Sequence, residues 1–241
     1  MAISRGPIIA KSGLILSLDA ADRNSYPGSG TIWYDMSGTR KNGTLSNGPT
    51  FDSANGGSIV FDGTDDIITL PQASNFYPLT SHTLEIWVKS SGLGAGQSEG
   101  GLIAIEYGVY MTINSSGNLR YTVLSTEGGF PPGSYVVNNI TTTVTPSLFN
   151  DVWRHVVCTC TSGGFYYMYV DGRLLTSGNA GSATLNSTFW PTLVARIGEN
   201  ANNSTIYQLK GNVAAARVYN RQLTTSEVLQ NFNTLRRRFN V

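Results

Sequence analysis

The sequence predicts an all-β fold in which two antiparallel sheets form a sandwich, followed by one C-terminal helix. The main observation is a central meander, whose strands are expected at residues 152–161, at residues 165–170 and after Asp171-Gly172. An Asp-Gly pair between apolar residues predicts a type I′ turn, because both of its central positions need a positive φ. The first of these strands is apolar on both faces, so both faces should be covered. The 27 glycines and the 13% of charged residues also suit many short strands joined by tight turns.

The other strands follow from similar runs along the chain. Residues 1–12 are expected to form a short N-terminal arm, and LILSL at 14–18 predicts the first strand. Two apolar runs, 59–61 and 67–70, flank the turn DGTDD and predict a hairpin. Residues rich in β-branched and aromatic side chains predict further strands at 83–89, 101–112, 119–125, 194–198 and 208–219. The long connection 126–150 is typical of a functional loop or of a loop with strands of its own.

Residues 223–238 predict the one helix. Thr224 with Glu227 three residues later is a capping-box pattern, which satisfies the free amide groups of a first helical turn. Apolar residues follow at helical spacing, at Val228, Leu229, Phe232 and Leu235. We therefore divide the chain into an arm at 1–12, a sandwich at 13–222 and a helix at 223–241, packed on or beside the sandwich.

Four segments, in this order along the chain, resemble a known family. WRHVV at 153–157 with YMYVDG at 167–172 looks like the signature hairpin of laminin-G-like domains, which belong to the concanavalin A-like lectin/glucanase superfamily. The other segments are GLILSLDA at 13–20 with DMSG at 35–38, IVFDGTDD at 59–66, and GNVAAARVYNRQL at 211–223. With the closing SEVLQNFNTLRRRF, they resemble most closely the versions found in virion proteins of tailed bacteriophages. The resemblance implies a concanavalin A-like jelly-roll sandwich.

Charge and hydropathy exclude several classes of partner. The formal net charge is +1, so no basic field is expected to attract nucleic acid. No apolar run reaches the roughly 20 residues that a membrane helix needs. Residues 1–7 lack the apolar core of a signal peptide, so we expect synthesis in a host cytoplasm without export by that route. Cys158 and Cys160 share one face of a strand and are expected to be buried and reduced.

Enzymatic activity is not expected. The glucanases of the superfamily place two carboxylates on one face of a strand, one as nucleophile and one as acid. The sequence has no Asp or Glu residues spaced by two and four along a predicted strand, and Glu85 and Glu106 each stand alone. A polysaccharide-degrading enzyme is therefore the least favoured function. His155 is expected to be a packing residue beside Trp153.

Structural calcium is the one cofactor that the resemblance implies as an alternative. The possible oxygen donors are Asp35, Asp62, Asp65, Asp66 and Asn42. Of these, Asp35, Asp65 and Asp66 are the candidate ligands, in loops that would have to converge. A hard cation such as calcium needs about six to eight oxygen ligands. The alternative is that these residues only stabilise turns, because Asp caps its own turn without any metal.

Carbohydrate binding would use exposed aromatic residues with polar residues around them. Trp33 and Tyr34 lie in a loop rich in Gly, Pro and Asn, and Tyr135 follows Pro131-Pro132-Gly133. These three are the candidate sugar-binding residues, although most aromatic side chains in a sandwich belong to its core. Five weaker candidates are Tyr107, Tyr110, Tyr121, Phe130 and Trp190.

Partner docking is expected at the two ends of the chain. Ile8 and Ile9 in the arm, and Arg236, Arg237 and Arg238 at the end of the helix, could contact neighbouring subunits. The alternatives are a frayed terminus and solvated arginines that complement the helix dipole. The predicted function is a non-enzymatic decoration or fibre-type protein of a tailed phage virion, homo-oligomeric, binding other virion subunits and a glycan. The alternative is a free carbohydrate-binding lectin.

Overall fold

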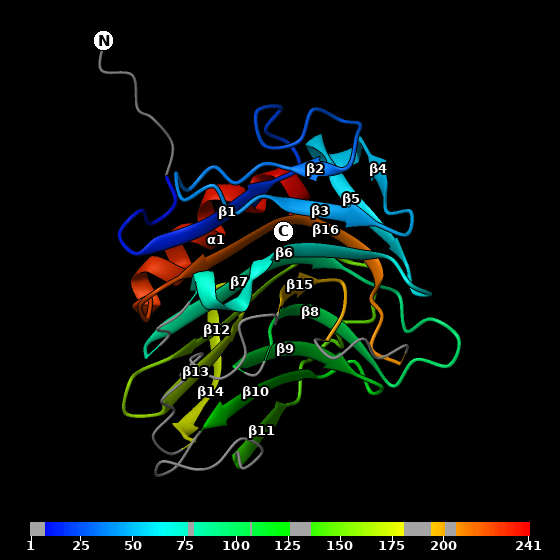
Figure 1. The fold of residues 1–241 in the computed structure, drawn as a ribbon. Helices are drawn as coiled ribbons and strands as arrows, with labels where there is room; N and C mark the ends of the chain where they lie inside the picture. The colour runs from blue at the N-terminus through cyan, green and yellow to red at the C-terminus, as the bar shows by residue number, and fades with distance from the viewer. Residues whose placement is uncertain (1–7, 77–79, 107, 126–135, 181–193, 201–205) are drawn as a thin grey trace.

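The protein is a sandwich of two eight-stranded sheets with one helix on its outside (Figure 1). A computed structural model describes residues 8–76, 80–106, 108–125, 136–180, 194–200 and 206–241. Every strand pairing in both sheets is antiparallel. The predicted fold class, a concanavalin A-like jelly-roll sandwich with a C-terminal helix, is confirmed.

Sheet A contains the central meander. Its strands lie in the order β14 (Arg173–Asn179), β13 (Phe165–Val170), β12 (Arg154–Cys160), β7 (His82–Lys89), β16 (Lys210–Tyr219), β5 (Ser58–Asp62) and β4 (Thr50–Asp52), and β1 (Leu14–Asp19) pairs with the C-terminal half of β16. Asp171 and Gly172 have φ values of 52° and 72°, as the type I′ turn between β13 and β14 requires. The predicted meander is therefore confirmed.

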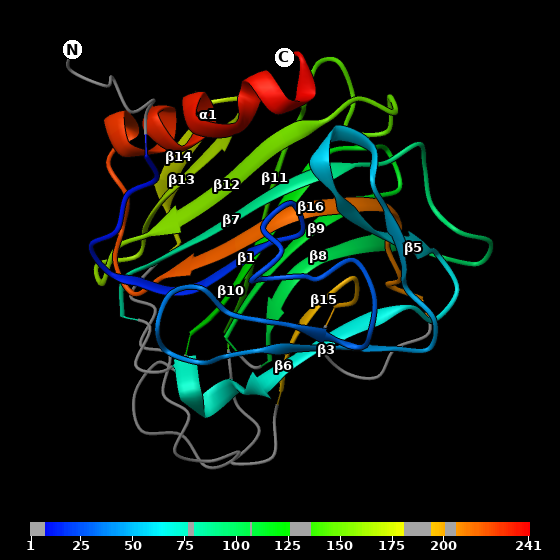
Figure 2. The same cartoon turned by 90° about the horizontal axis from the view of Figure 1, so that it is seen from above.

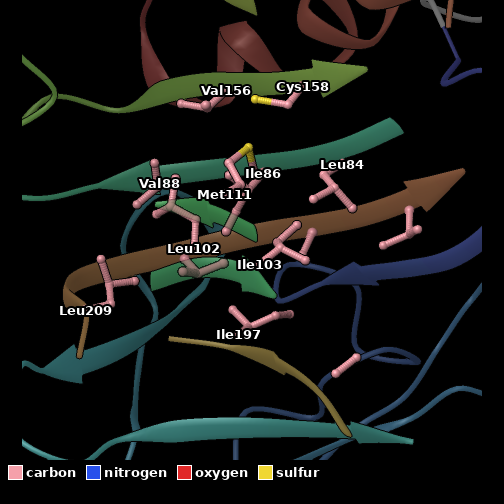
Figure 3. Packing of buried hydrophobic residues seen from close by; sticks show 14 of the residues in the cluster. Leu84, Ile86, Val88, Leu102, Ile103, Met111, Val156, Cys158, Ile197 and Leu209 are labelled. Carbon is pink, nitrogen blue, oxygen red and sulfur yellow. The ribbon is translucent and has the colours of Figure 1, made fainter. Parts of the chain in front are cut away.

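Sheet B covers the inner face of sheet A. Its order is β11 (Val136–Thr142), β10 (Leu119–Ser125), β9 (Val109–Asn114), β8 (Glu99–Ile105), β15 (Val194–Ile197), β6 (Ile67–Gln72), β3 (Gly43–Ser46) and β2 (Ile32–Trp33). The core lies between the sheets, where Ile86 and Cys158 of sheet A pack with Ile103 and Met111 of sheet B (Figure 3). Both cysteines are buried and free, as predicted.

Helix α1 (Thr225–Phe239) covers the outer face of sheet A (Figure 2). The capping box between Thr224 and Glu227 is present. Phe232 and Phe239 stack on Trp87 of β7, with ring centroids 5.8 and 4.6 Å away. Sheet A is thus buried on both faces at this place, because sheet B covers one face and α1 covers the other. No helix in the described residues is long and apolar enough to cross a membrane.

Two predicted elements of the sequence are wrong in detail. β5 and β6 do not form a hairpin, because β5 pairs with β4 and β16 in sheet A whereas β6 pairs with β3 and β15 in sheet B. The acidic turn between them therefore crosses from one sheet to the other. The predicted strand 101–112 is two strands, β8 and β9, and β8 already begins at Glu99. A hairpin signal is local, and it does not specify which sheet a strand joins.

Candidate functional site

The outer face of sheet B carries a row of mostly polar residues. Strand register places Asn139, Thr122, Tyr110, Ala104, Arg196, Thr69, Thr44 and Ile32 side by side across all eight strands. Their chain neighbours Tyr121, Met111 and Ile103 belong to the core, so the row points away from it. Thr122 donates a hydrogen bond to Asn139 Oδ1 at 2.6 Å.

Two Arg–Glu pairs lie on this outer face. The Glu99 carboxylate of β8 accepts hydrogen bonds from the Thr112 hydroxyl at 2.6 Å and from the Arg120 guanidinium. Arg196 donates to Glu199 at 2.9 Å. Glu99 and Glu199 are buried, whereas about a third of the Arg120 side chain, 34%, is exposed. We call these five residues the outer polar cluster, and Arg120 is where the cluster meets solvent.

Gly101 explains how the two pairs come together. β15 ends at Ile197, and Gly198, with φ 92°, turns the chain out of the sheet. Beyond the end of β15, the segment at Tyr207 lies beside β8 instead. Gly101 N of β8 donates a hydrogen bond to Tyr207 O at 3.0 Å. The chain at Glu199 and Asn200 crosses over Gly101, where a Cβ atom would lie 2.2 Å from the Glu199 carbonyl carbon. Only glycine leaves room for this crossing.

Three buried polar atoms lack partners, one in the outer polar cluster and two in the chain that runs past β8. Arg120 Nε, Asn200 Oδ1 and Gln208 Oε1 make no hydrogen bond within the part of the chain that the structure describes. Gln208 is 5% exposed, and its neighbour Leu209 lies in the core. An unsatisfied buried polar group costs about 1–3 kcal/mol, and a ligand that supplies the missing bond offsets this cost. A single partner that reached all three atoms would have to both donate and accept hydrogen bonds.

The predicted sugar-binding residues have different outcomes. Trp33 is a wrong prediction, because its ring is fully buried in the core against Tyr26 and cannot stack on a sugar. Tyr34 is 45% exposed and stays a candidate at the β2 edge of sheet B. Tyr135 lies outside the described residues. Of the weaker candidates, Tyr121 is a core residue paired with His82, and Tyr110 belongs to the outer row.

The candidate metal ligands do not converge. Asp35 accepts hydrogen bonds from the amides of Ser17, Ser37 and Lys41 and from two hydroxyl groups. Burial would raise the Asp35 pKa, but these donors lower it below its usual value. Asn42, which bonds Asp35 N, and Asn47, which bonds Asp65 O, lie at opposite ends of β3, about 16 Å apart at 3.3 Å per residue. Asp35 therefore anchors a loop far from Asp65.

Asp65 and Asp66 instead meet Asp62. Their carboxylate oxygens lie within 4.8 Å of one another, and Asp66 accepts from the Asp62 amide at 2.9 Å. Burial, together with the charges of Asp62 and Asp65, raises the pKa of Asp66. Calcium prefers oxygen ligands such as these three carboxylates. The three residues alone do not supply all the ligands of a calcium ion. A structural calcium ion would thus be held by these three residues, without Asp35.

Glu85 and Glu106, which each stand alone in the sequence, do not come together as a pair of carboxylates. Each has a partner of its own. Glu85 lies beneath α1 with its carboxylate 2.5 Å from Arg217 and 3.2 Å from His155 Nε2. Burial would raise the Glu85 pKa, but Arg217, helped by His155 and Asn231, lowers it to about 2. Glu106 accepts from the Val194 amide at 2.9 Å. His155 packs against Trp87 and Phe232, so it is buried under the helix as a packing residue.

The predicted docking residues are only partly available to a partner. Arg238 is a wrong prediction, because it bonds Asp19 at 2.7 Å and the carbonyl groups of Asn55 and Gly57, and so attaches α1 to its own sheet. Arg236 and Arg237 are exposed. The carbonyl group of Ile8 accepts from Gln230 of α1, while its side chain is 61% exposed, and Ile9 is half-buried. Docking by Ile8, Ile9, Arg236 and Arg237 stays a prediction.

Sequence reasoning missed the outer polar cluster. Glu99 falls in a stretch that looks like a flexible Gly/Ser loop, and Arg196 and Glu199 lie at the end of a short strand. Alternation of Arg120 with Tyr121 on β10 does indicate an outward arginine. Its partner, however, depends on the register of three strands.

A family model described as the concanavalin A-like lectin/glucanases superfamily matches residues 62–229, more than half of the chain. The chain belongs to this superfamily. The matched range contains every residue of the outer polar cluster. Among curated proteins, none matches the chain.

Solved structures with this fold include bacterial toxin domains. The binding domain of paraclostridial mosquitocidal protein 1 is 17% identical with a TM-score of 0.69, over 93% of this chain and 52% of that one. Botulinum neurotoxin type C, whose cell entry depends on two ganglioside molecules, is 14% identical with a TM-score of 0.66, over 92% and 51%. The binding domain of botulinum neurotoxin DC, in complex with rat synaptotagmin II, is 15% identical with a TM-score of 0.64, over 92% and 52%. The chain thus spans about half the length of these structures, and at this identity the likeness shows the fold alone.

Proposed function

We propose that this chain is a non-enzymatic, lectin-like binding module that recognises carbohydrate through the outer polar cluster. The observation that carries the proposal is the set of unpartnered atoms beside the cluster, Arg120 Nε, Asn200 Oδ1 and Gln208 Oε1. Sugar hydroxyl groups donate and accept hydrogen bonds, so they complement both the guanidinium and the two amide oxygens. Binding by structural neighbours to gangliosides and to a protein receptor supports a binding role for the fold.

The arrangement of the carboxylates supports a module without catalysis. A glycosidase needs one protonated carboxylic acid and a second carboxylate free to act on the sugar or on water. Glu99 and Glu199 are each engaged by an arginine. Glu85, with its lowered pKa and its place beneath α1, is suited neither to donate a proton nor to reach a substrate.

A glycan array with the folded protein tests the binding function. We expect hits for the wild-type chain and for Leu174→Ala, whose exposed side chain belongs to β14 of sheet A, and weaker hits for Arg120→Ala. The absence of any wild-type hit would remove the proposal. Incubation of each bound glycan with the protein, followed by chromatography, should show no release of shorter oligosaccharides.

We also propose that this binding takes place on a tailed phage particle, where the chain serves as an oligomeric decoration or fibre-type protein. The resemblance of segments such as 59–66 and 211–223 to virion proteins supports this setting. Light scattering of the protein, alone and mixed with purified undecorated particles, tests it. An oligomer that binds particles stoichiometrically is the expected result, and a monomer that ignores particles would favour a free lectin.

A further inference from the structure

We infer that the outer polar cluster selects neutral glycans over acidic ones. This inference rests on the proposed function and specifies its ligand. Among the described residues, the outward-facing charged side chains of sheet B and its β15 exit are Glu99, Glu106, Glu199, Arg120 and Arg196. Three carboxylates thus face two guanidinium groups, and both guanidinium groups already bond a glutamate.

The nearby acidic turn adds to this negative charge, because its three carboxylates outnumber Lys210, the register partner of Asp62. A Cβ atom on Gly198 would lie 3.1 Å from the Asp66 carbonyl oxygen, so the turn carrying Asp62, Asp65 and Asp66 is next to the chain that leads to Glu199. A sialic or uronic acid brought here would place its carboxylate among like charges that are only partly screened at short range. A neutral sugar avoids this repulsion.

The unpartnered atoms indicate a ligand that is held through hydroxyl groups rather than through a carboxylate. Asn200 Oδ1 and Gln208 Oε1 only accept hydrogen bonds, whereas Arg120 Nε only donates. A carboxylate accepts hydrogen bonds and gives none, so the carboxylate of an acidic sugar could satisfy Arg120 but neither amide oxygen. Acidic sugars also carry hydroxyl groups, so discrimination against them comes from the charge repulsion. A hydroxyl group can satisfy either kind of atom, and a ring with several hydroxyl groups can satisfy both kinds together.

The test uses a glycan array in which each neutral oligosaccharide stands beside its sialylated or uronic-acid counterpart, in buffers with calcium and with EDTA. We expect the neutral member of each bound pair to bind at least tenfold more tightly in both buffers. Tighter binding of the acidic members in either buffer would overturn the inference but leave the proposed function intact. No binding of any kind would count against the proposed function itself.

A substitution at Gln208 separates ligand binding from a structural role. Gln208→Met keeps the size of the side chain and removes the unpartnered oxygen. Calorimetric titration with the best neutral glycan should show binding weaker by about tenfold, the effect of one lost hydrogen bond to a buried acceptor. The melting temperature should stay the same or rise, because a buried unsatisfied oxygen is gone. Unchanged affinity, or a lower melting temperature, would show that Gln208 supports the fold and would overturn its assignment to the ligand.

Discussion

Glu85 of β7 and Arg217 of β16 form a buried ion pair 2.5 Å apart on the outer face of sheet A, directly beneath α1. Asn231 of α1 donates to the same carboxylate, and its own oxygen accepts from the Ala10 amide at 2.8 Å. One carboxylate therefore links two strands, the helix and, through Asn231, the segment at Ala10. Removal of one charged partner from this network would leave the other charge buried without a counter-charge.

Removal of the carboxylate should destabilise the protein strongly. For Glu85→Gln we expect a loss of about 3–5 kcal/mol in the free energy of unfolding, because Arg217 is left as an uncompensated buried charge. Chemical denaturation monitored by tryptophan fluorescence measures it. The matched control is Asp151→Asn, which removes an exposed partner of Lys89 at 3.9 Å and should cost less than about 1 kcal/mol. Equal effects of the two substitutions would contradict a buried pair.

The contribution of this carboxylate should depend on pH. The folded-state Glu85 pKa of about 2 lies below its ordinary value of 4.5, so the folded state binds the proton more weakly than the unfolded state. The stability that ionisation provides is then fully present above about pH 4.5 and is lost as the pH falls toward 2. The difference in unfolding free energy between wild type and Glu85→Gln should shrink over that range. A difference that stays constant from pH 6 to about pH 3 would be inconsistent with the lowered pKa.

The turn between β13 and β14 should be sensitive to a side chain at Gly172. Its φ is 72°, and a Cβ atom would lie 3.0 Å from Leu229 of α1. Gly172→Ala should therefore lower the unfolding free energy by about 1–2 kcal/mol through backbone strain and crowding against the helix. Gly163→Ala, in the other turn of the meander and 3.5 Å from the nearest atom, is the control and should change stability by less than about 0.5 kcal/mol.

The adjacent arginines at the end of α1 should differ in their effect. Arg238→Ala removes bonds to Asp19, Asn55 and Gly57, and we expect a cost of about 1–3 kcal/mol. Arg237→Ala should stay within about 0.5 kcal/mol, because its side chain is exposed. Thermal unfolding of both variants measures this. If Arg237→Ala were the more destabilising of the two, Arg238 would not be the residue that attaches the helix.

Local patterns in the sequence predicted most of the fold. Alternation along β7, the Asp-Gly turn at 171–172 and the capping box at Thr224 each act within a few residues, and all three are present. Pairing over longer distances was not predictable in the same way. The runs at 59–61 and 67–70 fit a hairpin locally, but burial of both runs is achieved by placing them in opposite sheets.

The candidate site depends still more on long-range structure. Arg120 meets Glu99 only because β8, β9 and β10 pair in one register, and Glu199 reaches the same surface because the chain crosses Gly101. Trp33 was assigned to a loop surface because β2 has only two residues, too few for an alternation pattern. The spacing of residues along the chain does not predict such contacts between distant segments.

The most direct test of carbohydrate binding at the outer polar cluster compares two adjacent glycines of β8. A Cβ atom at Gly101 would meet the Glu199 backbone at 2.2 Å, whereas one at Gly100 would lie 3.5 Å from Leu209, an ordinary contact. We would titrate the best glycan from the array into wild type, Gly100→Ala and Gly101→Ala, each checked for folding by circular dichroism. We expect Gly100→Ala to keep the wild-type affinity and Gly101→Ala to bind at least about tenfold more weakly. Wild-type affinity in a folded Gly101→Ala variant would place the glycan elsewhere and contradict the account.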